Sequence, residues 1–225
     1  MFKKALTITI LIAAFITLIF LGNWQLQRLE WKQAILADIA EQESINAVTT
    51  PLILNDETAE FQRGYIEGDF LMVPPIKLGP RTMEGQVGYH VLMPYRLLDG
   101  RTVVVNMGWV ANSKDNTITM PPFRNRIAGY LKTPDVPGQF TPKNNPQQDL
   151  FYSAEINTLN NYYDLNFYPK ILYMEFPPSE NPKTFDGLPK PNNNHAQYAA
   201  FWFGMAGLLV LLSGYAYWRQ RRQVS

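Results

Sequence analysis

Residues that could ligate a metal ion through nitrogen or sulfur are few in this chain. It has only two histidines, His90 and His195, and no cysteine. They are too far apart in sequence to form a local metal motif, so zinc or copper would find few ligands. His195 immediately precedes a long apolar run, which predicts a place at the edge of a bilayer. An imidazole there can ligate a haem iron, because the ring is largely neutral near pH 7 and the next aromatic residues offer flat apolar surface for a porphyrin (Tyr198, Phe201, Trp202 and Phe203). The alternative is an interfacial histidine hydrogen-bonded to headgroups or water.

A second candidate group follows the other long apolar run. Trp24 and Arg28 are one helical turn apart, so their side chains should point the same way. The guanidinium of Arg28 could pair with a haem propionate. The alternative for Arg28 is a contact with a headgroup or a glutamate at the membrane surface, since long basic side chains commonly reach to the interface.

Motifs of common enzyme classes are missing from the sequence. It contains no G-x-S-x-G elbow, no G-x-x-x-x-G-K-[ST] loop and no G-x-G-x-x-G fingerprint. A membrane-anchored hydrolase would need a nucleophile paired with a base, and Ser153 and Ser179 have no such context. Enzyme activity is therefore the weaker hypothesis, and we expect no catalytic residues.

Two uncharged segments predict transmembrane helices. Residues 5–22 are 18 residues long, about 27 Å as a helix, and residues 196–218 are 23 residues long with aromatic residues toward both ends. A hydrocarbon core is roughly 30 Å thick, so both segments fit. A cleaved signal peptide is the alternative for the first segment, but its apolar run is too long and no small-x-small site follows it.

The distribution of charge predicts the topology. Lys3 and Lys4 precede the first apolar run and Arg219, Arg221 and Arg222 follow the last, while all 19 acidic residues lie between them. The positive-inside rule then places residues 1–4 and 219–225 in the cytoplasm and the central domain in the periplasm. A mitochondrial inner membrane is the alternative, but the absence of an Arg-rich, Ser-rich presequence favours a bacterial inner membrane.

The central domain carries an excess of acidic side chains. Five of the 20 basic residues lie at the two ends, so residues 23–194 hold 15 basic and 19 acidic residues, a net charge of −4. That sign argues against nucleic acid as a partner, because phosphates require a basic face.

Small residues form a stripe on the second apolar segment. Ala196, Ala200 and Gly204 recur every four residues, with Gly207 three further on. Such a stripe lets another helix approach closely. The first apolar segment of this chain is one possible partner, and a helix of another membrane protein is the other.

The region between the apolar segments predicts a β-rich domain. Residues 23–45 have an amphipathic helical pattern, residues 46–182 contain β-rich runs separated by Pro, Gly, Asn and Asp, and residues 183–195 predict a tether back to the membrane. Because there is no alternation of strands and helices, the expected fold class is an α+β membrane protein in which two transmembrane helices flank a small antiparallel β-barrel or sandwich.

One hairpin is predicted in detail. Asp99-Gly100 lies between two β-rich runs, and this pair favours a two-residue type I′ turn because both central residues need positive φ. In that register Leu98 faces Arg101, His90 faces Trp109 and Leu92 faces Met107 (residue numbers summing to 199).

Four segments of the sequence together resemble a known family. They are LGNWQLQRLEWK after the first apolar run, GYHVLMPYRLLDGRTVVVNMGWV in the hairpin, IAGYLK, and NNHAQYAAFWFGMAG at the start of the second apolar run. In this order they resemble the Surfeit locus protein 1 family of cytochrome c oxidase assembly factors.

The resemblance implies a two-span inner-membrane protein that assists insertion of haem a into subunit I of the oxidase, alongside other assembly factors, without turnover of its own. His195 matches the family's proposed haem ligand, and Trp24, Gln25 and Arg28 match its motif after the first span. Gly108 and Trp109 match the end of its hairpin motif, but Met107 stands where relatives usually have arginine, so no role of that arginine carries over. A scaffold that stabilises oxidase subunits without touching haem is the alternative function.

Overall fold

The chain divides into two compact units. The computed structural model describes residues 2–55, 57–112 and 126–224. One unit, the helical unit, comprises residues 1–38 and 190–225, and the other, the barrel unit, comprises residues 39–189. Each unit is described by itself below.

The helical unit consists of most of α1 (Phe2–Glu43) and all of α3 (His195–Val224). α1 contains no proline, and its only glycine is Gly22, so nothing interrupts its backbone hydrogen bonds over 42 residues. Both helices are long and apolar enough to cross a membrane. Only 6% and 11% of their apolar windows is buried within the protein, which is unlike the core helix of a soluble domain.

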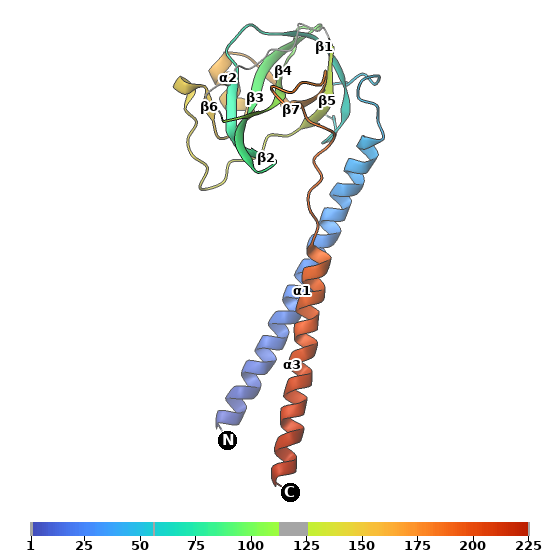
Figure 1. The fold of residues 1–225 in the computed structure, drawn as a ribbon, viewed down its shortest axis with the longest axis vertical. Helices are drawn as coiled ribbons and strands as arrows, with labels where there is room; N and C mark the ends of the chain where they lie inside the picture. The colour runs from blue at the N-terminus through green and yellow to red at the C-terminus, as the bar shows by residue number, and fades with distance from the viewer. Residues whose placement is uncertain (1, 56, 113–125, 225) are drawn as a thin grey trace. The chain divides into compact units, whose positions relative to one another are not determined.

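α1 and α3 lie side by side along part of their length (Figure 1). Gly22 provides the closest approach, because a Cβ there would overlap the ring of Phe203. Ala199 and Ala206, one turn before and one turn after Phe203, are each 2% exposed.

The predicted small-residue stripe is not the face that contacts α1. Ala196, Ala200 and Gly204 are exposed, and a Cβ added at Gly204 or Gly207 would meet nothing within 4 Å. The adjacent face of α3 makes the contact instead, because the ring of Phe203 fits against the bare backbone of Gly22.

Five strands of the barrel unit close into a ring. β1 (Arg63–Phe70) pairs with β5 (Arg126–Lys132), β5 with β7 (Phe167–Phe176), β7 with β4 (Thr102–Ala111), β4 with β3 (Gln86–Leu97), and β3 pairs back with β1. The expected β-barrel is therefore confirmed, and the sandwich alternative is not needed. Figure 1 shows this ring with its helix and edge strands.

Several helices and strands were not predicted from the sequence. β2 (Ile76–Met83) extends the sheet from β3, and β6 (Leu150–Phe151) pairs with β2. A one-turn 3-10 helix, η1 (Pro146–Gln148), precedes β6, and α2 (Ile156–Tyr163) packs near β7. β2 was missed because Pro80 interrupts its β pattern, and α2 because Leu159 is its one fully buried residue, too little for a periodic signal.

The strand β4 is buried on both faces. Val103, Val105 and Met107 belong to the core inside the ring, while Val104 belongs to a second core that includes Phe151 and Leu159 of α2. A strand covered on both sides needs a continuous apolar run, and TVVVNMGWVA supplies one.

The expectation of purely antiparallel pairing is wrong. β4 pairs with β7 in parallel, and β2 pairs with β6 in parallel. Parallel neighbours require a long crossover. The chain between β5 and β7, which includes β6 and α2, provides it for β7, and that connection has no strong sequence signature.

The predicted hairpin exists, but its turn differs. Its loop has three residues, 98–100: Leu97 N–H donates to the Arg101 carbonyl at 2.8 Å and Gly100 N–H to the Leu97 carbonyl at 3.0 Å. Gly100 has a φ of 88°, whereas Asp99 is not among the described residues with positive φ. The Asp99 carboxylate instead accepts from Arg101 N–H at 3.0 Å, an interaction that favours this wider turn.

The strand register shifts once along the hairpin. Between the turn and the bulge the predicted register is wrong, because the turn has three residues, and Leu92 faces Asn106 rather than Met107. The bulge between Val91 and Leu92 offsets this difference, so His90 faces Trp109 as predicted. Met107 is the extra residue of the bulge and points into the barrel core, fully buried.

Part of the segment expected to be a tether is packed structure. Trp109 N–H donates to the Lys183 carbonyl at 2.9 Å, Lys183 N–H donates to the Trp109 carbonyl at 2.7 Å, and Phe185 N–H donates to the Met174 carbonyl at 3.1 Å. Leu188 is 4% exposed. Residues 183–189 therefore lie against β4 and β7, because their backbone groups continue the pairing of these strands.

Candidate functional site

His195 is the first residue of α3, and its ring is held by Gln25 of α1. The distance from His195 Nδ1 to Gln25 Oε1 is 2.7 Å, and Gln25 is 9% exposed. An amide oxygen only accepts hydrogen bonds, so Nδ1 must be the donor. In the neutral ring the lone pair then lies on Nε2, the form in which an imidazole can bind a metal ion.

The contact between His195 and Gln25 is supported on both sides along α1. Gly22, one turn before Gln25, admits the ring of Phe203. Lys32, two turns after Gln25, donates from Nζ to the Asn192 carbonyl at 3.0 Å. These contacts hold the start of α3 against one face of α1, and they fix where the imidazole lies.

Arg28 lies between two tryptophans on α1. Its guanidinium carbon is 5.8 Å from the ring centroid of Trp24 and 5.4 Å from that of Trp31. Cation–π contacts of this kind order an exposed arginine without neutralising it. Within the described part of the chain Arg28 forms no ion pair, so its charge can meet an incoming carboxylate.

The two aromatic residues predicted on α3 have different surroundings. Tyr198 is 55% exposed. Trp202 is partly buried, packs edge-on against Phe201 with centroids 5.2 Å apart, and lines an apolar groove of about 420 Å³ between α1 and α3. The groove continues along residues 205–212 of α3, facing residues 14–21 of α1.

The structure thus joins the predicted residues in two pairs, His195 with Gln25 and Trp24 with Arg28. The hydrogen bond between His195 and Gln25 was not predicted, because 170 residues separate them. Only the motif after the first apolar run pointed to Gln25.

The hairpin residues that match the family motif contact other parts of the barrel unit. Gly108 has a φ of 134°, and a Cβ there would overlap the Lys183 carbonyl, which explains why glycine is required. Trp109 Nε1 donates to the Arg81 carbonyl at 2.9 Å. Met107, at the position of the relatives' arginine, is buried among apolar side chains of the barrel core and can make no ionic contact there.

Comparisons of the sequence with known proteins point to one family. The family model described as "SURF1 family" matches residues 12–207. A "SURF1-like protein" of Rickettsia bellii is 27% identical over 219 residues, covering 93% of this chain and 89% of that protein. "Surfeit locus protein 1" of Rattus norvegicus is 24% identical over 209 residues, covering 82% and 67%. "Cytochrome oxidase assembly protein SHY1" of Saccharomyces cerevisiae is 26% identical over 117 residues, covering 50% and 30%.

Proposed function

Since the chain belongs to the SURF1 family, we propose that it is a membrane-anchored assembly factor of cytochrome c oxidase and that it holds haem a at His195 before insertion into subunit I. The first half of this proposal follows from the relatives of this chain, one of which is named as a cytochrome oxidase assembly protein. The second half depends on the geometry around His195.

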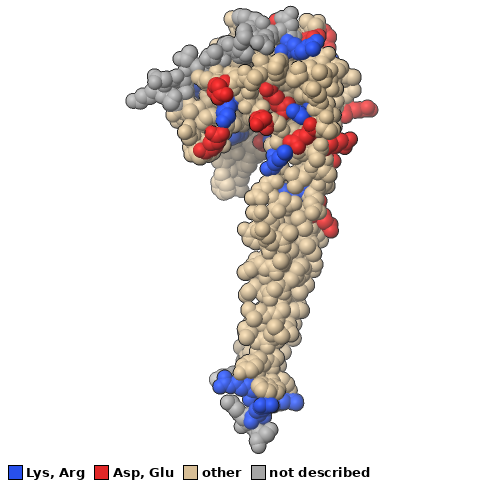
Figure 2. Space-filling model, turned by 45° about the vertical axis from the view of Figure 1, so that its right-hand side comes forward, with Lys and Arg blue, Asp and Glu red and all other residues tan. Residues whose placement is uncertain are grey.

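The membrane anchoring is supported by the two apolar helices. Arg221 and Arg222 lie in the last turn of α3, and Figure 2 shows basic side chains, without acidic ones, at this end of the helices. Under the positive-inside rule this charge distribution supports a cytoplasmic position for this end, and we infer that His195 lies at the opposite, periplasmic surface of a bacterial inner membrane. The related proteins come from both bacteria and eukaryotes, so a mitochondrial inner membrane is the corresponding alternative.

The single observation that carries the haem proposal is the hydrogen bond from His195 Nδ1 to Gln25 Oε1. It orients the ring and leaves the Nε2 lone pair for iron. A bound haem would supply an iron centre that accepts an imidazole lone pair, and two propionates. On this chain's side, His195 would donate the lone pair, Gln25 would fix the tautomer, and Arg28 would offer a cation to a propionate. Trp24, Tyr198 and Trp202 offer apolar contact surface for the porphyrin.

The test is an absorption spectrum of the full chain, purified in detergent from cells that synthesise haem a. We expect a haem spectrum in the wild type and its loss or marked weakening in His195→Ala. His90→Gln changes the other histidine, which lies in the barrel unit, and should leave the haem spectrum intact. A wild type without haem, or an unchanged spectrum in His195→Ala, would contradict the haem proposal.

A second candidate function is a scaffold for oxidase subunits that does not bind haem. The exposed small-residue stripe of Ala196, Ala200 and Gly204 favours it, because this face is left open for a helix of another protein. In this case Gly204→Leu should impair oxidase assembly in cells, and the purified wild type should contain no haem. An unimpaired assembly in Gly204→Leu would remove this candidate.

A further inference from the structure

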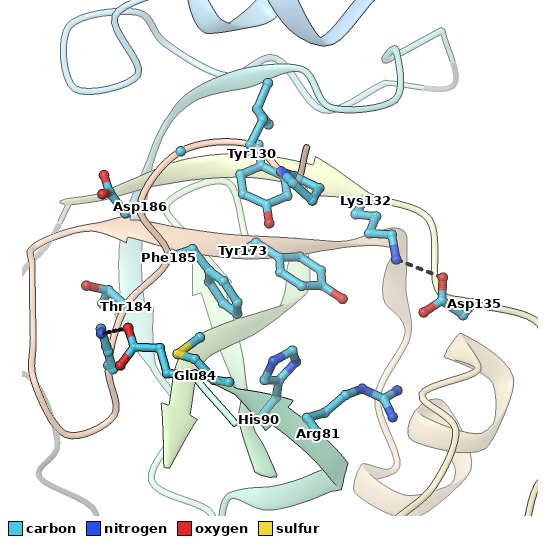
Figure 3. Close-up of a pocket in the computed structure, with 15 residues that line it drawn as sticks. Arg81, Glu84, His90, Tyr130, Lys132, Asp135, Tyr173, Thr184, Phe185 and Asp186 are labelled. Atoms are coloured by element: carbon cyan, nitrogen blue, oxygen red, sulfur yellow. Dashed lines mark hydrogen bonds and ion pairs between the residues drawn. The ribbon is translucent and has the colours of Figure 1, made fainter. Parts of the chain in front are cut away.

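The barrel unit contains a cavity that the proposed function does not use. Its volume is about 560 Å³, and it is bounded by residues of β2, β3, β5 and β7 and by the packed segment 183–189. Figure 3 shows Arg81 close to His90, with Tyr173 and Phe185 beside the His90 ring and Lys132 nearby. Polar groups from strands far apart in sequence therefore meet at one place.

The side-chain amide of Asn106 determines how two of these groups can bond. Asn106 is fully buried, and its Oδ1 accepts from Gly108 N–H at 3.2 Å, which makes the other amide atom the donor. Asn106 Nδ2 lies 3.1 Å from His90 Nδ1, so Nδ1 is the acceptor and the neutral ring carries its proton on Nε2. Asn106 also lowers the pKa of the Tyr173 hydroxyl, although burial raises that pKa overall.

The acceptor nitrogen of His90 is therefore occupied by Asn106, and the Nε2–H of the ring remains as a donor. The O–H of Tyr173 is a second donor in the lining of the cavity. Neither donor has an acceptor among the described residues. Two donors that are held in place and lack an acceptor favour a ligand with an acceptor group.

A cation also lies near these two hydrogen-bond donors. Lys132 is paired with Asp135 at 2.7 Å, and Lys183 is paired with Glu84 at 2.7 Å. Arg81 has no ion pair among the residues that the structure describes; its NH1 donates only to the carbonyl of Pro80. The lining therefore has one cation, Arg81, and one carboxylate, Asp186, that form no ion pair among the described residues. Arg81 lies near His90 in Figure 3, whereas Asp186 lies away from both.

The pKa of His90 reports the sign of the local potential. Burial lowers it most, and the charges of Arg81 and then Lys132 lower it further, to about 4, while Asp135 opposes them weakly. The positive charges outweigh the negative one at the ring, so an anion would be favoured beside it and the imidazole stays neutral near pH 7.

Aromatic rings form the rest of the wall. Tyr130 and Tyr173 are stacked with centroids 5.2 Å apart and an interplanar angle of 18°. The Phe185 ring lies 5.0 Å from Tyr173 and 5.2 Å edge-on from His90. These faces suit a flat apolar group attached to the anion.

From this arrangement we propose that the cavity binds a small organic acid with an aromatic or similarly flat body, its carboxylate paired with Arg81 and hydrogen-bonded by His90 Nε2–H and Tyr173 O–H. A carboxylate offers two oxygens and about four acceptor positions, enough for all three groups at once. The proposal concerns the barrel unit alone and does not depend on haem binding at His195.

The test is calorimetric titration of the full chain in detergent with 2-naphthoate, and with 2-naphthamide as the neutral analogue of the same shape. We expect one 2-naphthoate per chain, at least tenfold weaker binding of 2-naphthamide, and at least tenfold weaker binding of 2-naphthoate to Arg81→Gln. Arg96→Gln removes an equal charge from an exposed position on β3 and should change the affinity less than twofold.

A second variant distinguishes loss of binding from a folding defect caused by Arg81→Gln. Tyr173→Phe keeps the stacked ring and removes only the hydroxyl, and it should weaken 2-naphthoate binding several-fold. Absence of 2-naphthoate binding to the wild type, equal affinity for the amide, or equal loss in Arg81→Gln and Arg96→Gln would each overturn the proposal. Inorganic phosphate binding as tightly as 2-naphthoate would also overturn it, because the aromatic wall would then contribute nothing.

Discussion

Lowering the pH from 8 to 5 should destabilise the barrel unit through His90. The pKa of this imidazole falls from 6.5 to about 4 in the folded protein, because the ring is buried and because Arg81 and Lys132 lie near it, with Asp135 opposing. In the unfolded chain it takes up a proton near its ordinary pKa. Between the two values the unfolded state binds more protons, so the free energy of unfolding falls as the pH falls.

The two pKa values set the size of this effect. The contribution of His90 is fully present above about pH 6.5 and is reduced by about 2 kcal/mol at pH 5. The perturbation is the substitution His90→Gln, which removes the titrating group. Other titratable groups, including Glu175, whose pKa is raised by burial, are shared by both proteins and cancel in the difference.

The assay is denaturant unfolding of both full-length proteins in detergent, followed by tryptophan fluorescence at several pH values from 8 to 5. We expect the stability of the wild type to decline by about 2 kcal/mol more than that of His90→Gln over this range. If the two curves run parallel, His90 is either protonated in the folded protein or exposed, and the account of Asn106, His90 and the cavity is wrong.

Three further substitutions test other parts of the structure. Gly108→Ala should destabilise the barrel by about 2–4 kcal/mol in denaturant unfolding, since it combines a φ of 134° with a clash, whereas Gly138→Ala, where a Cβ meets only one atom at 3.9 Å, should have little effect. Arg63→Leu should cost about 3 kcal/mol in the same assay, because the 2.8 Å ion pair is lost and the Glu175 carboxylate stays buried without its partner. Gln25→Leu should weaken the haem spectrum of the purified chain while Gln25→Glu retains it, since a carboxylate can still accept from the imidazole; equal spectra in all three proteins would contradict the positioning role of Gln25.

Features that depend on neighbouring residues could be predicted from the sequence. The apolar runs predicted the two long helices, and the motifs at the two membrane exits pointed to the family. The hairpin was predicted around Asp99-Gly100 with His90 opposite Trp109. Between the turn and the bulge the register was wrong, because the turn has three residues rather than two, and neither the wider turn nor the bulge was predicted from the sequence.

His195 was selected as the candidate ligand from its place before an apolar run, and this information is local. Only the tertiary structure decided three other features. Gln25 orients His195, β4 and β7 are parallel neighbours, and residues 183–189 line a cavity beside His90. Each of these features joins groups separated by many residues along the chain. Side-chain periodicity records which face of an element is buried but not which distant element covers it, so contacts of this kind emerge only when the whole chain packs.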